Sequence, residues 1–423
     1  MKANNAAAVR LASNENPLGP SPLAVEAARR ALADTSRYPD ASGLALREAL
    51  SKKHDLPLDQ IMLGAGSTEL IDLSARLMLR PENTGITSYG SFPLYYMAIR
   101  AAGARLVETP LREYGFDLDA IARALTPEAR IIYLANPNNP TGTMFTADEF
   151  DAFFARVPSH VLVVLDEAYY EYVEARKSKI ENRNSEIRQG GKDEYRLYAA
   201  TDREPLAAES ESKLSHSKAA QMLGRKGQTH GERAEYSRAV EMVRRGANLL
   251  VLRTFSKVYG LAGMRIAYGL GPAALLEQMN QIRGPFNTSN VAQAAALAAL
   301  DDHEHVRRSV ECNRAGLAQL DAGLKELGVR AIPSVGNFIL AEFGYDTEPI
   351  CEELARQGVI VRPMRWMGFP QGIRISVGTR AENERFLSAL AKLRAPSVVG
   401  ASKKQGSPRV KLKRTGKARN HSK

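Results

Sequence analysis

A lysine that directly follows a buried apolar run is the first residue whose type and place could do chemistry. Lys257 ends the segment TFSK at 254–257, which comes after the apolar stretch 248–252. A lysine at the end of a buried strand loses part of its hydration, and this loss lowers its pKa and makes the amine nucleophilic. Such an amine suits Schiff-base chemistry. Taken alone, a Ser-Lys pair is more often a solvated strand end.

Two further segments carry residue types that bind phosphate. Arg265 lies eight residues after Lys257, in GLAGMR at 260–265, and its guanidinium is a planar fork of donors. The segment GAGSTE at 64–69 precedes the helical stretch 70–79, so its backbone N–H groups and the helix dipole can bind an anion. Each signal is weak alone, because surface arginines and glycines before helices are common.

An aspartate closes another apolar run. Asp166 follows the stretch 161–165, so its carboxylate sits where a buried strand meets a ligand crevice. A carboxylate there can hold a pyridinium nitrogen protonated, which keeps such a ring an effective electron sink. Tyr169, three residues later, can reach a phenolic oxygen of the same ring. Taken alone, the segment DEAY is more simply explained by a helix N-cap aspartate.

An asparagine in a proline-rich turn is the fourth candidate. Asn139 lies in NPNNPTG at 136–142, directly after the apolar stretch 131–134. Two prolines and a glycine make the turn rigid, so that it could present the Asn139 amide to a ligand oxygen. The alternative is a rigid turn without a ligand.

The elements that must position these residues are short strands and helices in alternation. Apolar runs at 131–134, 161–165 and 248–252 alternate with amphipathic stretches, a pattern that predicts an α/β fold with a mostly parallel sheet and helices on both faces. Such a sheet is buried, and its ligands gather beyond the carboxyl ends of the strands. Because the candidate residues follow these runs, we expect one shared site.

The length of 423 residues favours two domains. After residue 287 the pattern changes to an alanine-rich helix at 291–300 and short strands at 336–342 and 373–377, typical of a smaller α+β domain. From 176 to 234 the chain turns polar and densely charged, which predicts a surface insertion, largely disordered. The expected organisation is an N-terminal segment at 1–35 packing with the small domain, a large domain at 36–286, a small C-terminal domain at 287–396 and a basic disordered tail at 397–423.

The net charge of +11 does not indicate a nucleic-acid partner for the fold, although the basic tail could contact nucleic acid or another polyanion instead of being simply solvated. Nine lysines and arginines and no acid lie in the tail at 397–423, which leaves +2 for the rest. Cys312 and Cys351 are too few for a disulfide framework and wrongly spaced for zinc, so no metal is expected. No apolar run approaches the ~20 residues of a membrane span, and no secretory signal is evident, so we expect a cytoplasmic protein.

The ordered combination of motifs is far more specific than any single one. In chain order, the motifs are GAGSTE at 64–69, SYGSF at 88–92, NPNNPTG at 136–142, DEAYYEY at 166–172, TFSKVYGLAGMR at 254–265 and IRISVGT at 373–379. Together they resemble the fold-type-I pyridoxal-phosphate (PLP) aminotransferases. The segments LASNENPLGP at 11–20, RYPD at 37–40 and GVIVRP at 358–363 indicate a resemblance to the histidinol-phosphate aminotransferase family. The likeness covers most of 9–175 and 236–395.

The resemblance implies a role for each candidate residue. Lys257 would form the Schiff base with PLP and shuttle the substrate proton, Asp166 would pair with the pyridinium, and Tyr89 would stack on the ring. Asn139 and Tyr169 would hydrogen-bond the phenolate oxygen of the ring. The cofactor phosphate would be held by Ser67, Thr68, Ser256 and Arg265, and by Tyr38 of the other subunit, so the resemblance also implies a homodimer with shared active sites.

The resemblance also implies substrate-binding residues. Arg374 would grip an α-carboxylate, Arg362 would help to bind a substrate phosphate, and Asn16 would lie at the substrate mouth. Arg362 precedes a proline at a strand end and could instead be solvated. Trp366 and Phe369 could wall the pocket or simply pack between domains. The family carries further residues before its LASNENP segment, so we assign no equivalent here of the tyrosine found in them.

The expected reaction is transamination of a phosphorylated amino alcohol or amino acid with a 2-oxo acid. In the histidine pathway it would interconvert histidinol phosphate and imidazole-acetol phosphate, with glutamate and 2-oxoglutarate as the second pair. Aromatic amino-acid aminotransferases share nearly every motif, and the segment MRWMGF at 364–369 leaves an aromatic substrate open. A PLP decarboxylase of phosphorylated amino acids uses the same framework. A non-catalytic descendant is a further alternative.

Overall fold

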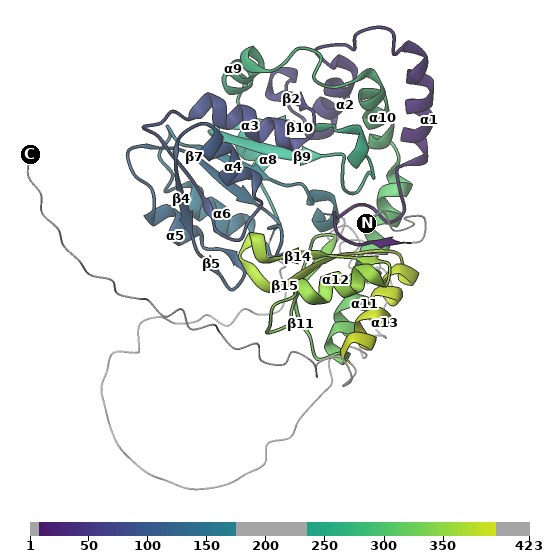
Figure 1. The fold of residues 1–423 in the computed structure, drawn as a ribbon. Helices are drawn as coiled ribbons and strands as arrows, with labels where there is room; N and C mark the ends of the chain where they lie inside the picture. The colour runs from purple at the N-terminus through teal and green to yellow at the C-terminus, as the bar shows by residue number, and fades with distance from the viewer. Residues whose placement is uncertain (1–7, 175–234, 395–423) are drawn as a thin grey trace, which may run out of the picture.

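The computed structural model describes residues 8–174 and 235–394 (Figure 1). The predicted insertion at 176–234 and the predicted tail at 397–423 lie outside the described residues, so both stay predictions. None of the described helices is long and apolar enough to cross a membrane.

A seven-stranded sheet forms the centre of the larger part of the molecule (Figure 1). Its strands, in spatial order, are β2 (Ile61–Gly64), β10 (Ala267–Leu270), β9 (Leu249–Thr254), β8 (Leu162–Asp166), β7 (Ala129–Ala135), β3 (Thr84–Ser88) and β4 (Arg105–Thr109). Only β10 runs antiparallel to its neighbours. Every residue of β8 and β9 is buried, as expected for strands covered on both faces. The predicted α/β fold with a mostly parallel sheet is confirmed.

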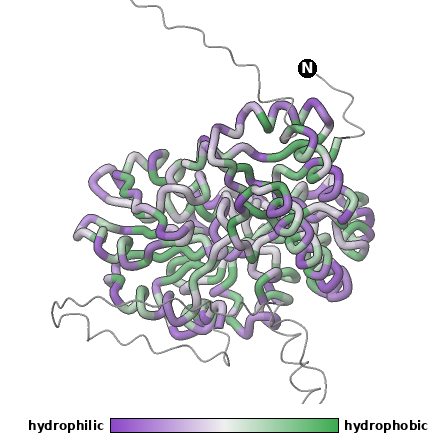
Figure 2. The backbone as a smooth tube through the Cα atoms, turned by 90° about the horizontal axis from the view of Figure 1, so that it is seen from below, coloured by the Kyte–Doolittle hydropathy of each residue, from purple (hydrophilic) through white to green (hydrophobic). Residues whose placement is uncertain are grey.

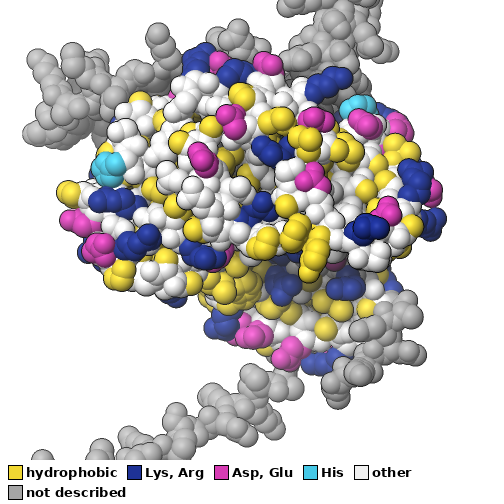
Figure 3. All heavy atoms as spheres, turned by 90° about the horizontal axis from the view of Figure 1, so that it is seen from above, with side chains coloured by type: hydrophobic (Ala, Val, Ile, Leu, Met, Phe, Trp, Pro, Cys, Tyr) yellow, Lys and Arg dark blue, Asp and Glu magenta, His cyan; other side chains and the backbone are white. Residues whose placement is uncertain are grey.

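Helices surround this sheet. They are α1 (Pro22–Ala31), α2 (Leu44–His54), α3 (Ser67–Met78), α4 (Leu94–Ala101), α5 (Leu118–Arg123), α6 (Ala147–Phe154), α8 (Ala239–Arg244), α9 (Ala273–Ile282) and α10 (Asn290–Leu300). A small hairpin of β5 (Leu111–Arg112) and β6 (Gly115–Phe116) accompanies them. Figure 2 shows hydrophobic positions gathered toward the middle of the molecule and hydrophilic ones on the outer turns. On the face seen in Figure 3, cationic and anionic side chains are interspersed.

A second, four-stranded antiparallel sheet forms the smaller part. Its order is β11 (Arg330–Ile332), β12 (Phe338–Glu342), β15 (Phe369–Ser376) and β14 (Arg362–Met364), and it is accompanied by α11 (His303–Glu326), α12 (Glu348–Arg356) and α13 (Arg380–Arg394). The side chains of this part form a separate apolar core around Leu320, Ile375 and Phe386. This is the α+β arrangement that the sequence predicted for the C-terminal part.

The N-terminal segment contacts both parts. Its strand β1 (Val9–Arg10) pairs in parallel with β13 (Val359–Ile360) of the smaller part. Its helix α1 packs instead on α10, and both helices belong to the core of the larger sheet. The sequence placed α10 in the small domain because its alanines gave no sign of which sheet they face. These alanines allow a close approach to Ala24 and Ala28 of α1, both buried. The predicted domain boundaries otherwise stay a prediction.

The chain re-enters the described structure after residue 234 at a defined place. The backbone N–H of Ala147 donates to the Glu235 carbonyl over 2.8 Å, and the buried Tyr236 hydroxyl donates to the Asn136 carbonyl. The Tyr236 ring lies 5.9 Å, centroid to centroid, from that of Tyr170, four residues before the chain leaves the described part. The two ends of the undescribed segment therefore start from neighbouring positions on the larger part.

Candidate active site

A cavity of about 380 Å³ lies at the carboxyl ends of the parallel strands, between the larger and the smaller part. Ser13 and Asn14 of the N-terminal segment also line it. Of the residues proposed from the sequence, it is lined by Ser67, Thr68, Asn139, Asp166, Tyr169, Ser256, Lys257, Arg265, Arg362 and Arg374. Ten residues from six motifs thus meet in one place.

Lys257 follows β9 and is half-buried in this cavity. Its Nζ donates to the Ser13 carbonyl over 3.3 Å and lies 5.8 Å from the centre of the Tyr169 ring. Desolvation, reinforced by the positive charge of Arg374, lowers the pKa of Lys257 to about 8. A sizeable fraction of the amine is therefore neutral and nucleophilic near neutral pH.

Asp166 is the last residue of β8, and its side chain is buried. Its Oδ1 accepts from the backbone N–H of Ala168 over 3.1 Å, and its Oδ2 accepts from the hydroxyl of Tyr95 over 2.9 Å. Burial raises the pKa of Asp166 to about 6, while both hydrogen bonds act in the opposite direction. The carboxylate is therefore ionised at neutral pH and can face a cationic ring nitrogen.

The opposite end of the cavity is built for an anion. Ser67 and Thr68 open α3, where backbone N–H groups and the helix dipole favour negative charge. Gly66 precedes them with a φ of +82°, and the Arg265 guanidinium lies so close that a Cβ at Gly66 would overlap it. Ser256 completes this end of the cavity. Three hydroxyls, a helix N-terminus and a guanidinium fit the phosphate of PLP.

Tyr169 and Asn139 lie between these two ends. Tyr169 is buried, and its hydroxyl oxygen accepts from Nδ2 of Asn14 over 2.9 Å. Burial raises the pKa of Tyr169 to about 12, so the hydroxyl keeps its proton. Asn139 Oδ1 accepts from Nη1 of Arg374 over 2.6 Å, which leaves the Asn139 amide nitrogen as its donor toward a ligand. Both side chains can therefore donate to a negatively charged oxygen.

Arg362 and Arg374 come from neighbouring strands of the small sheet. They lie directly opposite each other in the β14–β15 ladder. Nη2 of Arg374 and Nε of Arg362 donate to the same carbonyl, that of Ala12, over 2.7 and 3.2 Å. Nε of Arg374 is buried and has no hydrogen-bond partner within the described residues. Two converging cations with a spare donor form a site for an anionic substrate.

The structure does not bring Tyr89 into the cavity. Its side chain is 56% exposed and lies against Gly368, and it is absent from the cavity lining. Phe92, three residues later in the same SYGSF segment, does line the cavity. The family resemblance assigned the stacking role to Tyr89, whereas the direction of the turn before α4 decides which aromatic ring points inward. Phe92 is thus the better placed stacking partner.

Asn16 is also displaced from its predicted place. Its Nδ2 donates to the Val258 carbonyl over 2.7 Å and to Ser309 Oγ over 2.8 Å, and the side chain is buried away from the main cavity. Its neighbour Asn14 lines that cavity instead. The LASNENP segment does contribute to the site, but the residue spacing does not determine which of its asparagines points into the cavity. Asn14 adopts a φ of 53°, and this local backbone conformation sets the direction.

Two aromatic candidates can now be distinguished. Trp366 lines the cavity, and 58% of its surface is exposed. This position agrees with the alternative in which Trp366 forms part of the pocket wall. Phe369 does not line it, and its ring stacks on Tyr114 at 6.3 Å between centroids. Tyr38 is also absent from this cavity, is 82% exposed and stacks on Phe286 at 4.6 Å. Trp366 is therefore the aromatic residue at the cavity mouth.

The mostly parallel sheet, the lysine after β9 and the carboxylate at the end of β8 together define a fold-type-I aminotransferase. The chain belongs to the aminotransferase class I and II family, whose model matches residues 7–213 and 219–390.

Curated relatives narrow the likeness. The chain is 41% identical over 383 residues, 90% of this chain and 88% of the relative, to histidinol-phosphate aminotransferase 1 of Nitrosococcus oceani. It is 40% identical over 390 residues, 92% and 90% of the two chains, to histidinol-phosphate aminotransferase 2 of Pseudomonas aeruginosa. The chain is thus similar to histidinol-phosphate aminotransferases over about nine tenths of its length.

Solved structures agree with this fold. The histidinol-phosphate aminotransferase of Sinorhizobium meliloti, solved in complex with pyridoxal-5'-phosphate, has a TM-score of 0.75 and 26% identity, covering 92% of this chain and 90% of that one. The aspartate aminotransferase of Thermus thermophilus with maleate has a TM-score of 0.70 and 21% identity, covering 91% of each chain. The second likeness concerns the fold alone.

Proposed function

We propose that this protein is a PLP-dependent aminotransferase acting on histidinol phosphate, with glutamate and 2-oxoglutarate as the second substrate pair. The observation that carries the proposal is the pairing of Arg362 with Arg374 in the cavity that also holds Lys257. Histidinol phosphate and glutamate share a primary amine and an anionic end, so one cavity with a nucleophilic lysine and two cations can serve both. The names of the curated relatives support this substrate.

The residues of the cavity divide between holding the cofactor and moving a proton. When bound, PLP supplies an aldehyde that condenses with primary amines and a protonated ring that withdraws electrons. Lys257 would hold the aldehyde end through Nζ and then carry the proton of the substrate α-carbon. Asp166 would face the ring nitrogen as a carboxylate, and Phe92 would cover the ring.

The remaining residues would orient the cofactor and substrate. Asn139 and Tyr169 would donate to the ring oxygen, with Asn14 keeping the Tyr169 hydroxyl in place. Arg374 would bind the carboxylate of glutamate, and Arg362 would bind the phosphate of histidinol phosphate. The cofactor phosphate would rest at the anion end of the cavity, on Ser67, Thr68, Ser256 and Arg265.

We further propose a homodimer with shared active sites. Tyr38 is largely exposed and does not line the cavity of its own chain, and its stacking partner Phe286 is 41% exposed. Exposed aromatic pairs are common in interfaces. A second copy would bury this pair and bring Tyr38 to the phosphate end of the other site. The proposed setting is the cytoplasm, without a nucleic-acid partner.

Mixing two variants tests the shared site. Lys257→Ala removes the amine from its own chain, and Tyr38→Ala removes the ring offered to the other chain. A mixed dimer contains one site with both residues, so unfolding and refolding the two variants together should restore activity above the sum of the parents. Activity equal to that sum would show that Tyr38 serves its own chain or none.

A substrate panel tests the reaction. The protein with PLP is incubated with 2-oxoglutarate and with histidinol phosphate, phenylalanine or a phosphorylated amino acid such as phosphothreonine, and glutamate and carbon dioxide are measured. We expect glutamate in step with the histidinol phosphate consumed, and none with Lys257→Ala. A higher rate with phenylalanine would indicate an aromatic aminotransferase. Carbon dioxide without glutamate would indicate a decarboxylase. PLP absorbance that Lys257→Ala leaves unchanged would indicate a non-catalytic protein.

A further inference from the structure

Tyr95 is the residue whose contacts point beyond the roles described so far. It lies in α4, far from Asp166 in sequence, and its hydroxyl donates to Asp166 Oδ2 over 2.9 Å. The side chain is fully buried and lines the cavity beside Phe92. Within residues 8–174 and 235–394, the other hydrogen bond to the Asp166 carboxylate comes from the backbone N–H of Ala168. Tyr95 is therefore the one side-chain donor to this carboxylate within the described residues.

The Tyr95 ring is fixed from two sides. It stacks on Tyr133 at 5.2 Å between centroids and an interplanar angle of 3°, and it meets the edge of Phe92 at 5.6 Å. Tyr133 is itself held by hydrogen bonds between its hydroxyl and Ser74 Oγ, at 2.9 Å, and the Ile71 carbonyl, at 3.1 Å. A donor on a packed ring has little freedom to turn away, so its direction toward Asp166 is preorganised.

The protonation of both partners is defined by burial. Burial raises the pKa of Tyr95 well above its ordinary value, so its hydroxyl is a donor at all working pH values. Burial also raises the pKa of Asp166 toward neutrality, and the Tyr95 hydrogen bond opposes this rise. A protonated Asp166 could not stabilise a cationic ring nitrogen, so the balance between burial and this hydrogen bond has a functional consequence.

We propose that Tyr95 is a positioning residue that keeps the Asp166 carboxylate ionised and aimed at the ring nitrogen of the cofactor. This inference rests on the role proposed above for Asp166. Tyr95 acts through Asp166 and need not touch the cofactor. Its removal should therefore weaken only those interactions that involve the ring nitrogen.

The test uses a matched pair of variants. Tyr95→Phe removes the hydroxyl on Asp166 and keeps the stacked ring. Tyr133→Phe removes the hydroxyl of the partner ring, which contacts Ser74 and Ile71 rather than Asp166. Affinity is measured by absorbance titration of full-length protein, first with PLP and then with an analogue in which carbon replaces the ring nitrogen. The ratio of the two affinities isolates the nitrogen.

We expect Tyr95→Phe to weaken PLP binding about tenfold to hundredfold, the usual worth of a hydrogen bond to a charged group. Binding of the carbon analogue should change less than threefold or so, and Tyr133→Phe should leave the ratio as in wild type. As the pH is lowered, PLP affinity should begin to fall at a higher pH in Tyr95→Phe than in wild type or Tyr133→Phe. The reason is that Asp166 takes up a proton more readily without the Tyr95 hydroxyl.

A double variant closes the test. In an Asp166→Asn background the ionised carboxylate is gone, so adding Tyr95→Phe should not change the affinity ratio further. An equal loss for PLP and the carbon analogue, or an equal effect of Tyr95→Phe and Tyr133→Phe, would overturn the inference and leave the proposed aminotransferase untouched. A wild-type protein that does not bind PLP would instead overturn the proposed function.

Discussion

Arg362 lies directly opposite Arg374 in the β14–β15 ladder, and both guanidinium groups donate to the Ala12 carbonyl. Like charges placed opposite each other in a sheet are unfavourable. Burial and the charge of Arg362 together lower the pKa of Arg374 to about 10, so it stays charged at neutral pH. An anionic substrate relieves this repulsion, and the arrangement thereby favours binding of carboxylate or phosphate.

The first prediction concerns this pair. Arg374→Lys keeps the charge but removes the planar fork, so the KM for glutamate should rise about tenfold to hundredfold with little change in PLP affinity. Arg365→Lys is the matched control. Arg365 lies next to the small sheet and does not line the cavity. Its guanidinium forms ion pairs with Asp346 and, over 3.2 Å, with Glu348. Steady-state kinetics check both variants. A fall in kcat at unchanged KM would contradict the substrate role of Arg374.

The second prediction concerns the pH dependence of PLP capture. Desolvation first, and the Arg374 charge second, lower the pKa of Lys257 to about 8. Only the neutral amine attacks an aldehyde, so the capture rate should rise with pH with a midpoint at about 8 and level off at higher pH. Arg374→Gln removes a cation and should move this midpoint upward. Arg362→Gln should leave it in place. Stopped-flow absorbance measures the rate. A wild-type midpoint near the ordinary pKa of a lysine would show that desolvation does not lower the pKa of Lys257.

The third prediction concerns the cavity mouth. Trp366 is the exposed aromatic residue that lines the cavity, and it can stack on a planar substrate ring. Trp366→Ala should raise the KM for histidinol phosphate about threefold to tenfold, the usual worth of an aromatic pair. Glutamate has no ring, and its KM in the same variant serves as the internal control. Parallel rises for both substrates would mean that Trp366 shapes the cavity without recognising the imidazole.

Much of the site could be predicted from the sequence because it follows buried strands. Asp166 ends β8 and Lys257 lies three residues after β9, and parallel strands bring their carboxyl ends to one edge. Local order in the chain was thus enough to place both residues in one cavity. The same reasoning correctly predicted a mostly parallel sheet and a smaller α+β part.

The remainder depends on contacts between distant segments. The sequence around Tyr95 gives no sign of its hydrogen bond to Asp166. Asn14 and Tyr169 are likewise far apart in the sequence and come into contact only in the folded chain. The choice between Tyr89 and Phe92 depends on how one turn is directed, which residue type does not determine. The buried ion pair of Arg253 with Glu167, at 2.7 Å, was missed for the same reason.

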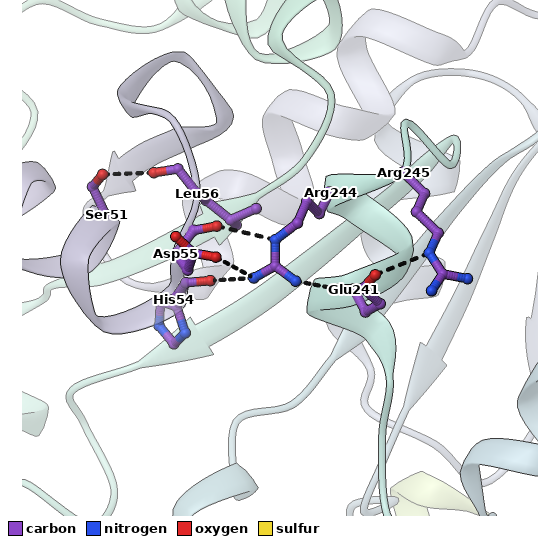
Figure 4. Close-up of polar contacts among 7 residues, drawn as sticks. All are labelled: Ser51, His54, Asp55, Leu56, Glu241, Arg244 and Arg245. Carbon is purple, nitrogen blue, oxygen red and sulfur yellow. Dashed lines mark hydrogen bonds and ion pairs between the residues drawn. The ribbon is translucent and has the colours of Figure 1, made fainter.

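The last prediction concerns how the chain is anchored after it re-enters. α8 follows the undescribed segment, and Arg244 at its end reaches the carboxyl end of α2 (Figure 4). Its Nε donates to the Asp55 carbonyl over 3.1 Å and its Nη2 to the His54 carbonyl over 3.0 Å. Asp55 has a φ of 50°, which ends α2 and leaves these carbonyls without helical partners. Arg244 satisfies them and places a cation at the negative end of the helix dipole.

Arg244→Ala should therefore lower the free energy of unfolding by about 1 to 2 kcal/mol, because two carbonyl groups lose a charged donor. Arg245→Ala is the control, since Arg245 is 77% exposed and donates only to Glu241 in the described contacts (Figure 4). Its loss should cost no more than about 0.5 kcal/mol. Urea unfolding followed by circular dichroism measures both. If the two variants were equally stable, the contact between α8 and α2 would be a surface ion pair without a capping role.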